Sequence, residues 1–359
     1  ASALFALDVL IKGVLNVVTG LLEGIFLILP IPGVDRLMGA LRAKNGSPAP
    51  FQVKYWCIGN EMYGPWQLGH MALEHYVQKH NWVVDKMRAV DPAIVTFASG
   101  SVETKSKDKK RSWSEGLLTD CRHHMDYLAE HFYVQEKADI IEHAKLAADK
   151  VRAKADQFRE LRARLKMQDS PIRLAMTEWN YWYGPHVFGE LGTRYFLKDG
   201  LGIAAGLHEF FRNSDVYFMA NYAQTVNVIG CVKASKTAAA METTGLALTL
   251  YRRHFGTVPV KVAGEFVPLD VAAALTKDGK TLTLGVVNPT AQAQTLALTC
   301  QGCKPAGAGR RVSFGGSDPK AYNDPDQPAV FKLQEAKADT DGRLTVGPYS
   351  ATVFVLPVR

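Results

Sequence analysis

Glu61 and Glu178 are the two side chains of this sequence whose settings are most typical of catalysis. Glu61 follows the predicted strand 52–59 as part of an Asn60-Glu61 pair, and Glu178 directly follows the predicted strand 172–177. In parallel β/α barrels, residues at the carboxyl ends of strands line the catalytic face. Two carboxyl groups there can divide the work of glycoside hydrolysis, in which one protonates the leaving oxygen and the other attacks the sugar or activates water. The pattern therefore favours a sugar-cleaving site over a pair of surface carboxylates.

Aromatic side chains surround both glutamates and offer flat apolar faces on which sugar rings can stack. The candidates for this role are Trp56, Trp66, Trp179, Tyr181, Trp182 and Tyr183. His70, His124 and His131 are alternative proton-transfer groups. We interpret them as structural or supporting residues, because two carboxyl groups suffice for this chemistry.

The segment before residue 255 predicts the elements that must position these side chains. Short apolar runs alternate with amphipathic stretches of helical spacing, which is the pattern of parallel βα units. The expected strands are 52–59, 93–99, 125–134, 172–177 and 216–221, and the expected helices are 73–90, 138–167, 193–213 and 237–254.

From about residue 257 the alternation stops and only short strands are expected. They span 258–262, 271–275, 281–287, 295–299, 343–346 and 351–356. Asp278-Gly279 predicts a hairpin turn. The alternation of Leu282, Leu284 and Val286 with smaller residues predicts a half-buried antiparallel strand. We therefore expect three parts: an apolar helical segment (1–36), a catalytic β/α barrel (37–255) and an all-β sandwich (256–359).

The first 36 residues are strongly apolar, but their uncharged stretches are too short for a transmembrane helix. Polar residues recur every three or four positions, which favours a mostly buried helix. A membrane-surface segment is the alternative for residues 3–34, so a membrane partner is left open. A secretion signal is disfavoured, because no basic region precedes the apolar run.

Composition and charge exclude several classes of protein. The 359 residues are 47% hydrophobic and 21% charged, with a net charge of +7, which is ordinary globular usage. The basic run 105–111 lacks interleaved aromatic residues, so a solvated loop is favoured over a nucleic-acid site. Five cysteines imply no disulfide framework. Cys300 and Cys303 form a single C-x-x-C motif, which we interpret as a coincidental loop spacing and not as a zinc or redox site. We expect no cofactor, no metal and no nucleic-acid partner.

Residues 54–71 (KYWCIGNEMYGPWQLGHM) resemble the acid/base signature of family 51 glycoside hydrolases, the α-L-arabinofuranosidases. The segments 50–100 and 172–228 follow the same family pattern. Residues 219–228 (MANYAQTVNV) resemble the eighth barrel strand, and 348–356 (PYSATVFVL) resemble the last strand of the terminal sandwich. The resemblance runs from about residue 38 to residue 359. It implies a (β/α)8 barrel with a jelly-roll-like β domain and a retaining mechanism.

The resemblance also implies roles for individual residues. Glu61 matches the general acid/base and Glu178 the nucleophile. The residues that match sugar-contacting positions are Asn60, Tyr133, Trp182 and Gln224. A tyrosine hydroxyl beside the nucleophile would hold it ionised, because a hydrogen bond to the charged form lowers a carboxyl pKa. An acid/base is expected to have a raised pKa instead.

Too few residues precede Glu61 for the first three units of such a barrel, at about 30 residues a unit. We therefore expect an α/β fold in which only barrel strands four to eight are recognisable, followed by the sandwich. The function expected is release of terminal α-L-arabinofuranosyl groups from arabinose-containing carbohydrates. The alternatives are an inactive or sugar-binding fragment, or a β-glucanase or xylosidase specificity on the same barrel. Homo-oligomerisation is left open, and the cytoplasm is the favoured compartment.

Overall fold

The computed structural model describes residues 34–104, 111–304, 306–338 and 342–359. The expectations for residues 1–33 and for the basic run 105–110 lie outside these ranges. None of the helices in the described ranges combines the length and apolar character of a membrane-spanning segment. The chain divides into two compact units: residues 1–131 with 157–176, and residues 132–156 with 177–359. The predicted boundary near residue 255 stays a prediction.

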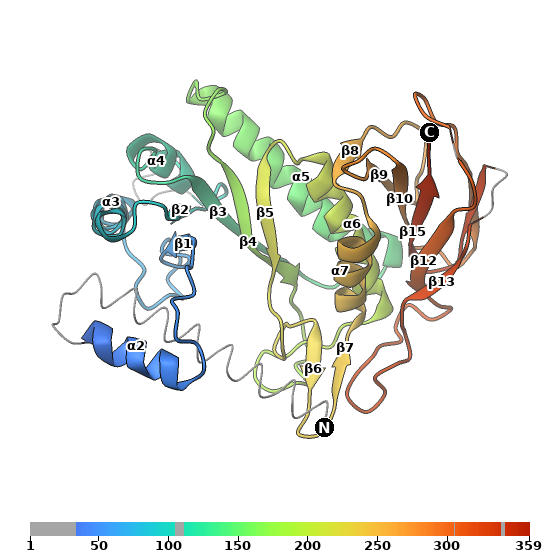
Figure 1. The fold of residues 1–359 in the computed structure, drawn as a ribbon, viewed down its shortest axis with the longest axis horizontal. Coiled ribbons are helices and arrows are strands. Elements are labelled where there is room, and N and C mark those ends of the chain that lie inside the picture. The colour runs from blue at the N-terminus through green and yellow to red at the C-terminus, as the bar shows by residue number, and fades with distance from the viewer. Residues whose placement is uncertain (1–33, 105–110, 305, 339–341) are drawn as a thin grey trace. The chain divides into compact units, whose positions relative to one another are not determined.

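A five-stranded sheet in the order β1-β2-β3-β4-β5 positions the candidate site (Figure 1). Its strands are β1 (Tyr55–Ile58), β2 (Val95–Ser99), β3 (Tyr127–Val134), β4 (Arg173–Tyr181) and β5 (Tyr217–Tyr222). β1 pairs with β2, and β2 with β3, in parallel register. Helices α3 (Leu73–Val90), α4 (Trp113–Asp120), α5 (Ile140–Arg164) and α6 (Leu197–Arg212) separate consecutive strands. The prediction of an α/β fold with five recognisable barrel strands is confirmed.

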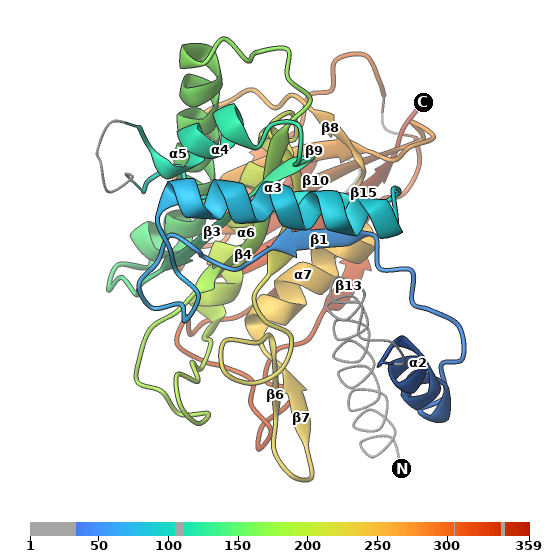
Figure 2. The same cartoon turned by 90° about the vertical axis from the view of Figure 1, so that its left-hand side faces the viewer.

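In the first unit, α3 begins and ends at the predicted residues and lies along β1 (Figure 2). Its buried side chains are Leu73, Tyr76, His80 and Val84, which recur every three or four positions and form one face of the helix. Helix α2 (Val34–Lys44) precedes the sheet.

Helix α4 was not among the expected elements. Ser112 accepts a hydrogen bond from the Glu115 backbone N–H at 3.2 Å, and the Glu115 carboxylate accepts one from the Ser112 N–H at 3.3 Å. This reciprocal pair is a capping box. The S-x-x-E spacing of Ser112 and Glu115 is the sequence signal that could have located this helix.

In the second unit, the helix expected at 237–254 is shorter than predicted. Strands β6 (Val232–Ala234) and β7 (Ala239–Met241) form a hairpin, and β7 occupies the start of the predicted helix. Helix α7 (Thr243–His254) begins only after Glu242. Helix α6 is buried over most of its length and packs against α7. Glycines such as Gly202 permit this burial, because a Cβ there would overlap the Tyr181 hydroxyl.

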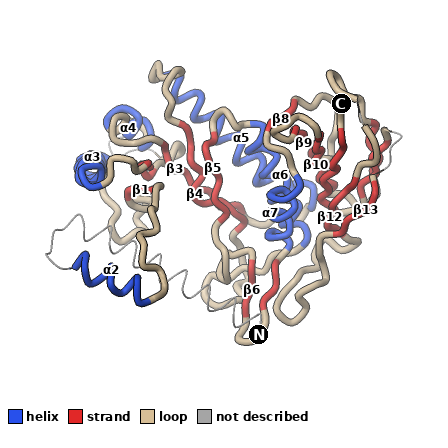
Figure 3. Tube along the Cα trace, viewed as in Figure 1, coloured by secondary structure: helices blue, strands red, loops and turns tan. Residues whose placement is uncertain are grey.

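Beyond α7 the described residues form strands and loops without a helix, as predicted (Figure 3). The larger sheet has the order β13-β12-β15-β10-β9-β8, and β11 pairs with β14 in a second sheet. The bounds are β8 (Val258–Val260), β9 (Asp270–Leu275), β10 (Thr281–Asn288), β11 (Gln294–Ala297), β12 (Arg310–Gly315), β13 (Gln334–Lys337), β14 (Arg343–Val346) and β15 (Ser350–Pro357). β9 and β10 are antiparallel neighbours across the predicted Asp278-Gly279 turn. β12 and β13 were not predicted.

The prediction that one face of β10 is solvated is wrong. Leu282, Leu284 and Val286 join the apolar core of the β region. On the other face, a Cβ at Gly285 would meet His208 of α6 at 2.5 Å and Tyr251 of α7 at 2.9 Å. The sequence alternation suggested a half-buried strand because the second face of β10 carries small or polar residues. These residues are buried, since their small size lets the helices pack closely against the strand.

Candidate active site

Glu61 lies in the loop that follows β1, where the backbone turns sharply. Gly59 has φ +85° and Glu61 has φ +46°, which is the left-handed region that non-glycine residues seldom adopt. The Glu61 carbonyl accepts a hydrogen bond from the Gly64 N–H at 2.7 Å, which closes the turn. A left-handed backbone conformation costs free energy for a glutamate, so it persists only where the surrounding structure enforces it. Residues of this kind cluster at functional sites.

Three donors hold the Glu61 carboxylate. The Nδ1–H of His131 donates to Oε1 at 2.9 Å, and the Trp66 indole N–H and the Gln67 amide (3.3 Å) donate to Oε2. These bonds, that of His131 above all, outweigh the effect of burial and lower the pKa of Glu61 from 4.5 to about 2. The expectation of a raised acid/base pKa is therefore wrong for this arrangement, because the donors stabilise the ionised form.

Replacing His131 with alanine is expected to raise the pKa of Glu61 toward 4.5, because the largest stabilising hydrogen bond to its carboxylate is lost. The pKa is measurable by 13C NMR titration of the protein labelled at glutamate side chains. His124→Ala serves as the control, since His124 pairs with Asp85. An unchanged Glu61 titration in the His131 variant would contradict this assignment.

Glu178 lies near the end of β4 and is half-buried. The Tyr133 hydroxyl donates a hydrogen bond to its Oε2 at 2.6 Å. Trp182 stands edge-on to Tyr133, with ring centroids 5.0 Å apart, and its indole N–H donates to the Leu191 carbonyl at 3.1 Å. The structure thus brings together three of the residues named from the sequence: Glu178, Tyr133 and Trp182.

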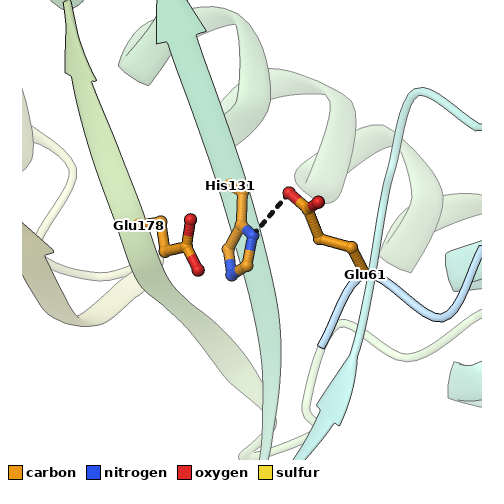
Figure 4. A group of neighbouring side chains, drawn as sticks. All are labelled: Glu61, His131 and Glu178. Atoms are coloured by element: carbon orange, nitrogen blue, oxygen red, sulfur yellow. Dashed lines mark hydrogen bonds and ion pairs between the residues drawn. The ribbon is translucent and has the colours of Figure 1, made fainter. Parts of the chain in front are cut away.

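Strand β3 connects these two sets of contacts. His131, the partner of Glu61, and Tyr133, the partner of Glu178, are two residues apart on this strand. Side chains at i and i+2 of a strand project from the same face. Figure 4 shows Glu61, His131 and Glu178, with the bond between Glu61 and His131 dashed. One strand therefore supplies a hydrogen-bond donor to each candidate carboxylate.

The remaining predicted site residues, Asn60 and Gln224, lie just after the ends of β1 and β5. Asn60 is exposed beside Glu61, and Gln224 is exposed just after β5. The Gln224 backbone is held by the loop that follows it, since its N–H donates to Ile229 and its carbonyl accepts from Cys231.

Half of the predicted sugar-stacking aromatics are core residues instead. Trp179 and Tyr181 are fully buried, and Tyr183 is 7% exposed. Trp179 packs against Phe132 and Phe210. Alternation along β4 explains the correction, since residues next to the site-facing Glu178 point into the opposite layer. Trp66 and Trp182 retain accessible surface.

Two carboxylates near the carboxyl ends of strands in a parallel β/α sheet are typical of the barrel glycoside hydrolases. The comparisons with known proteins are specific within that class. Residues 17–160 match the family model "Alpha-L-arabinofuranosidase 1 domain", and residues 177–350 match "Alpha-L-arabinofuranosidase C-terminal domain". The chain is a homologue of the α-L-arabinofuranosidases of glycoside hydrolase family 51.

Individual relatives agree with the family matches. The probable α-L-arabinofuranosidase C of Aspergillus niger is 30% identical over 291 residues, which are 71% of this chain and 56% of the relative. The α-L-arabinofuranosidase of Thermotoga maritima, solved as an arabinose complex, has a TM-score of 0.76 at 27% identity. That match covers 89% of this chain and 69% of the solved one. The chain thus spans only about half the length of the first curated relatives it matches.

Proposed function

We propose that this chain is a retaining glycoside hydrolase that releases terminal α-L-arabinofuranosyl groups from arabinose-containing oligosaccharides and polysaccharides. The observation that supports this most is the pair of hydrogen bonds from β3, one to each carboxylate. The names of the relatives support the choice of sugar. They include an intracellular exo-α-(1→5)-L-arabinofuranosidase of Acetivibrio thermocellus, which is 28% identical over 220 residues. That name also favours an intracellular site of action.

In the first step, a Glu178 carboxylate oxygen attacks the anomeric carbon while Glu61 gives its proton to the departing glycosidic oxygen. The bond to the leaving group breaks and a glycosyl ester with Glu178 forms. Tyr133 holds the attacking carboxylate in place through its 2.6 Å hydrogen bond. Asn60, Trp182 and Gln224 contact the bound sugar.

In the second step, Glu61 removes a proton from water, whose oxygen attacks the anomeric carbon and releases Glu178. The low pKa of Glu61 in this structure corresponds to the ionised form that this step needs. The first step needs the protonated form. Substrate binding must therefore replace donors that now stabilise the carboxylate, of which the exposed Trp66 is the most accessible.

The test is hydrolysis of aryl glycosides that share a leaving group and differ in the sugar. Turnover of the α-L-arabinofuranoside well above that of the β-D-xyloside and β-D-glucoside is the result expected. Preference for either of the latter two would favour another specificity on the same barrel. Binding of the arabinoside without any turnover would favour the non-catalytic sugar-binding alternative.

A further inference from the structure

Asn180 lies on β4, two residues beyond the proposed nucleophile, and its side chain is fully buried. Side chains at i and i+2 of a strand leave the same face, so Asn180 projects from the same face of β4 as Glu178. A buried amide carries donors and an acceptor that need partners inside the protein. The partners of Asn180 therefore determine what is tied to the end of β4 that carries Glu178.

The amide of Asn180 is hydrogen-bonded to the backbone on both sides. Its Nδ2 donates to the carbonyls of Ala223 at 2.6 Å and Ile229 at 2.8 Å, and its Oδ1 accepts from the Tyr181 N–H at 2.7 Å. Carbonyls only accept and a backbone N–H only donates, so the amide fits in one orientation. The Tyr195 hydroxyl, 2.7 Å from Nδ2, supports this arrangement by donating to the Tyr181 carbonyl at 2.7 Å.

Ala223 and Ile229 are the two ends of the loop that carries the exposed Gln224. This loop follows β5, the neighbour of β4 in the sheet (Figure 1). The Gln224 N–H donates to the Ile229 carbonyl at 3.4 Å, which is a longer bond than either of those that Asn180 donates to the loop. One buried side chain thus ties both ends of this loop to the strand that carries Glu178.

We propose that Asn180 is a positioning residue that holds Gln224 in a fixed place relative to Glu178. The inference rests on the proposed function, which assigns Gln224 to sugar binding and Glu178 to the attack. Asn180 is too deeply buried to touch a sugar, so it acts through the loop. Reaction rates fall steeply when a group that orients the substrate moves by about 1 Å, and a loop released at both ends allows such a shift.

A double-mutant cycle on kcat/KM for an aryl α-L-arabinofuranoside tests whether Asn180 acts through Gln224. Asn180→Ala in the parent chain is expected to lower kcat/KM on the order of 10- to 100-fold. Gln224→Ala removes the sugar contact itself. In the Gln224→Ala background, the loss from Asn180→Ala should therefore shrink to less than about 3-fold. Losses that multiply instead would show that Asn180 acts independently of Gln224 and would overturn the proposal.

Asn288, which is as fully buried as Asn180, is a matched control for a general loss of stability. Its Nδ2 donates to the carbonyls of Gln292 at 2.7 Å and Gly347 at 2.8 Å. Its Oδ1 accepts from the Thr290 N–H at 3.0 Å. Asn288→Ala should lower the midpoint of thermal unfolding to a similar extent as Asn180→Ala but leave kcat/KM unchanged. An equal loss of kcat/KM in the two variants would overturn the positioning role.

Hydrogen exchange of the loop keeps the inference testable apart from turnover. Asn180→Ala should speed exchange in residues 224–231, where the N–H groups of Gln224 and Cys231 bond across the loop, and Asn288→Ala should not. Asn180→Ser keeps a hydroxyl donor and should give smaller changes in the same direction, which serves if the alanine variant does not fold. Unchanged exchange in the Asn180 variants would overturn the proposal. Faster loop exchange without turnover by the parent chain would support the link to the loop and count against the proposed function.

Discussion

Replacing Glu178 with glutamine is expected to lower kcat for an aryl α-L-arabinofuranoside on the order of 10⁴-fold or more, because the nucleophile of the covalent step is lost. Glutamine has nearly the shape of glutamate and can still accept the Tyr133 hydrogen bond, so folding should be preserved. The rates are compared under saturating substrate, with thermal unfolding as a check on the fold.

Two further variants test whether the loss is specific to Glu178 and whether it comes from the missing nucleophile. Glu190→Gln alters an exposed glutamate in the segment after β4 and should leave kcat unchanged. Glu178→Ala should lose activity like Glu178→Gln, but an added small anion such as azide can occupy the vacated space and attack the sugar. A Glu178→Gln enzyme that retained even a tenth of the parent rate would remove Glu178 from the mechanism.

The second large effect is expected on stability, at the buried ion pair of Lys233 and Glu242. Lys233 and Glu242 are both fully buried, with Nζ 3.4 Å from a carboxylate oxygen. Lys233 also donates to the Val228 carbonyl at 2.9 Å, and Glu242 accepts from the Tyr195 N–H at 3.1 Å. Lys233→Met should lower the free energy of unfolding by about 3–5 kcal/mol, because it leaves a buried carboxylate without its cation.

This loss should depend on pH in a definite direction. Burial raises the pKa of Glu242 above its usual 4.5, so the folded state binds its proton more tightly than the unfolded state does. Stability from this group therefore falls as pH rises above 4.5. Without Lys233 the pKa of Glu242 rises further, so the cost of Lys233→Met should be larger at pH 8 than at pH 5.

Urea unfolding of the parent and the variant at the two pH values measures this difference. Lys236→Met, three residues away at an exposed position, is the matched control and should cost less than about 0.5 kcal/mol. A Lys233→Met cost near that of Lys236→Met, or a cost that falls with rising pH, would contradict the role assigned to the pair.

The strand and helix order of the sheet region was predictable because its signals are local. Helix α3 has an apolar face of regular spacing and ends at Asp91-Pro92, so both its bounds could be read from the sequence. The two glutamates could be found for a related reason, since Glu61 comes shortly after β1 and Glu178 lies near the end of β4. Hairpin β6–β7 was missed because no turn motif separates it from the helical pattern after it.

The properties that depend on three-dimensional neighbours could not be predicted. The pKa of Glu61 is set by His131, which is 70 residues away in the sequence. The burial of Trp179 and Tyr181 depends on which face of β4 meets α5 and α6, and that is a tertiary property. Lys233 and Glu242 gave no signal either, because a lysine and a glutamate nine residues apart are ordinary surface residues until the hairpin between them folds.

The central claim is that this chain cleaves arabinofuranosides with retention, and 1H NMR of the first minutes of hydrolysis tests it most directly. A double displacement through Glu178 predicts that α-L-arabinofuranose appears first and then mutarotates to the equilibrium mixture. Initial release of the β anomer would show a single displacement and contradict the nucleophilic role of Glu178. No arabinose at all from the folded parent chain would contradict the proposed activity itself.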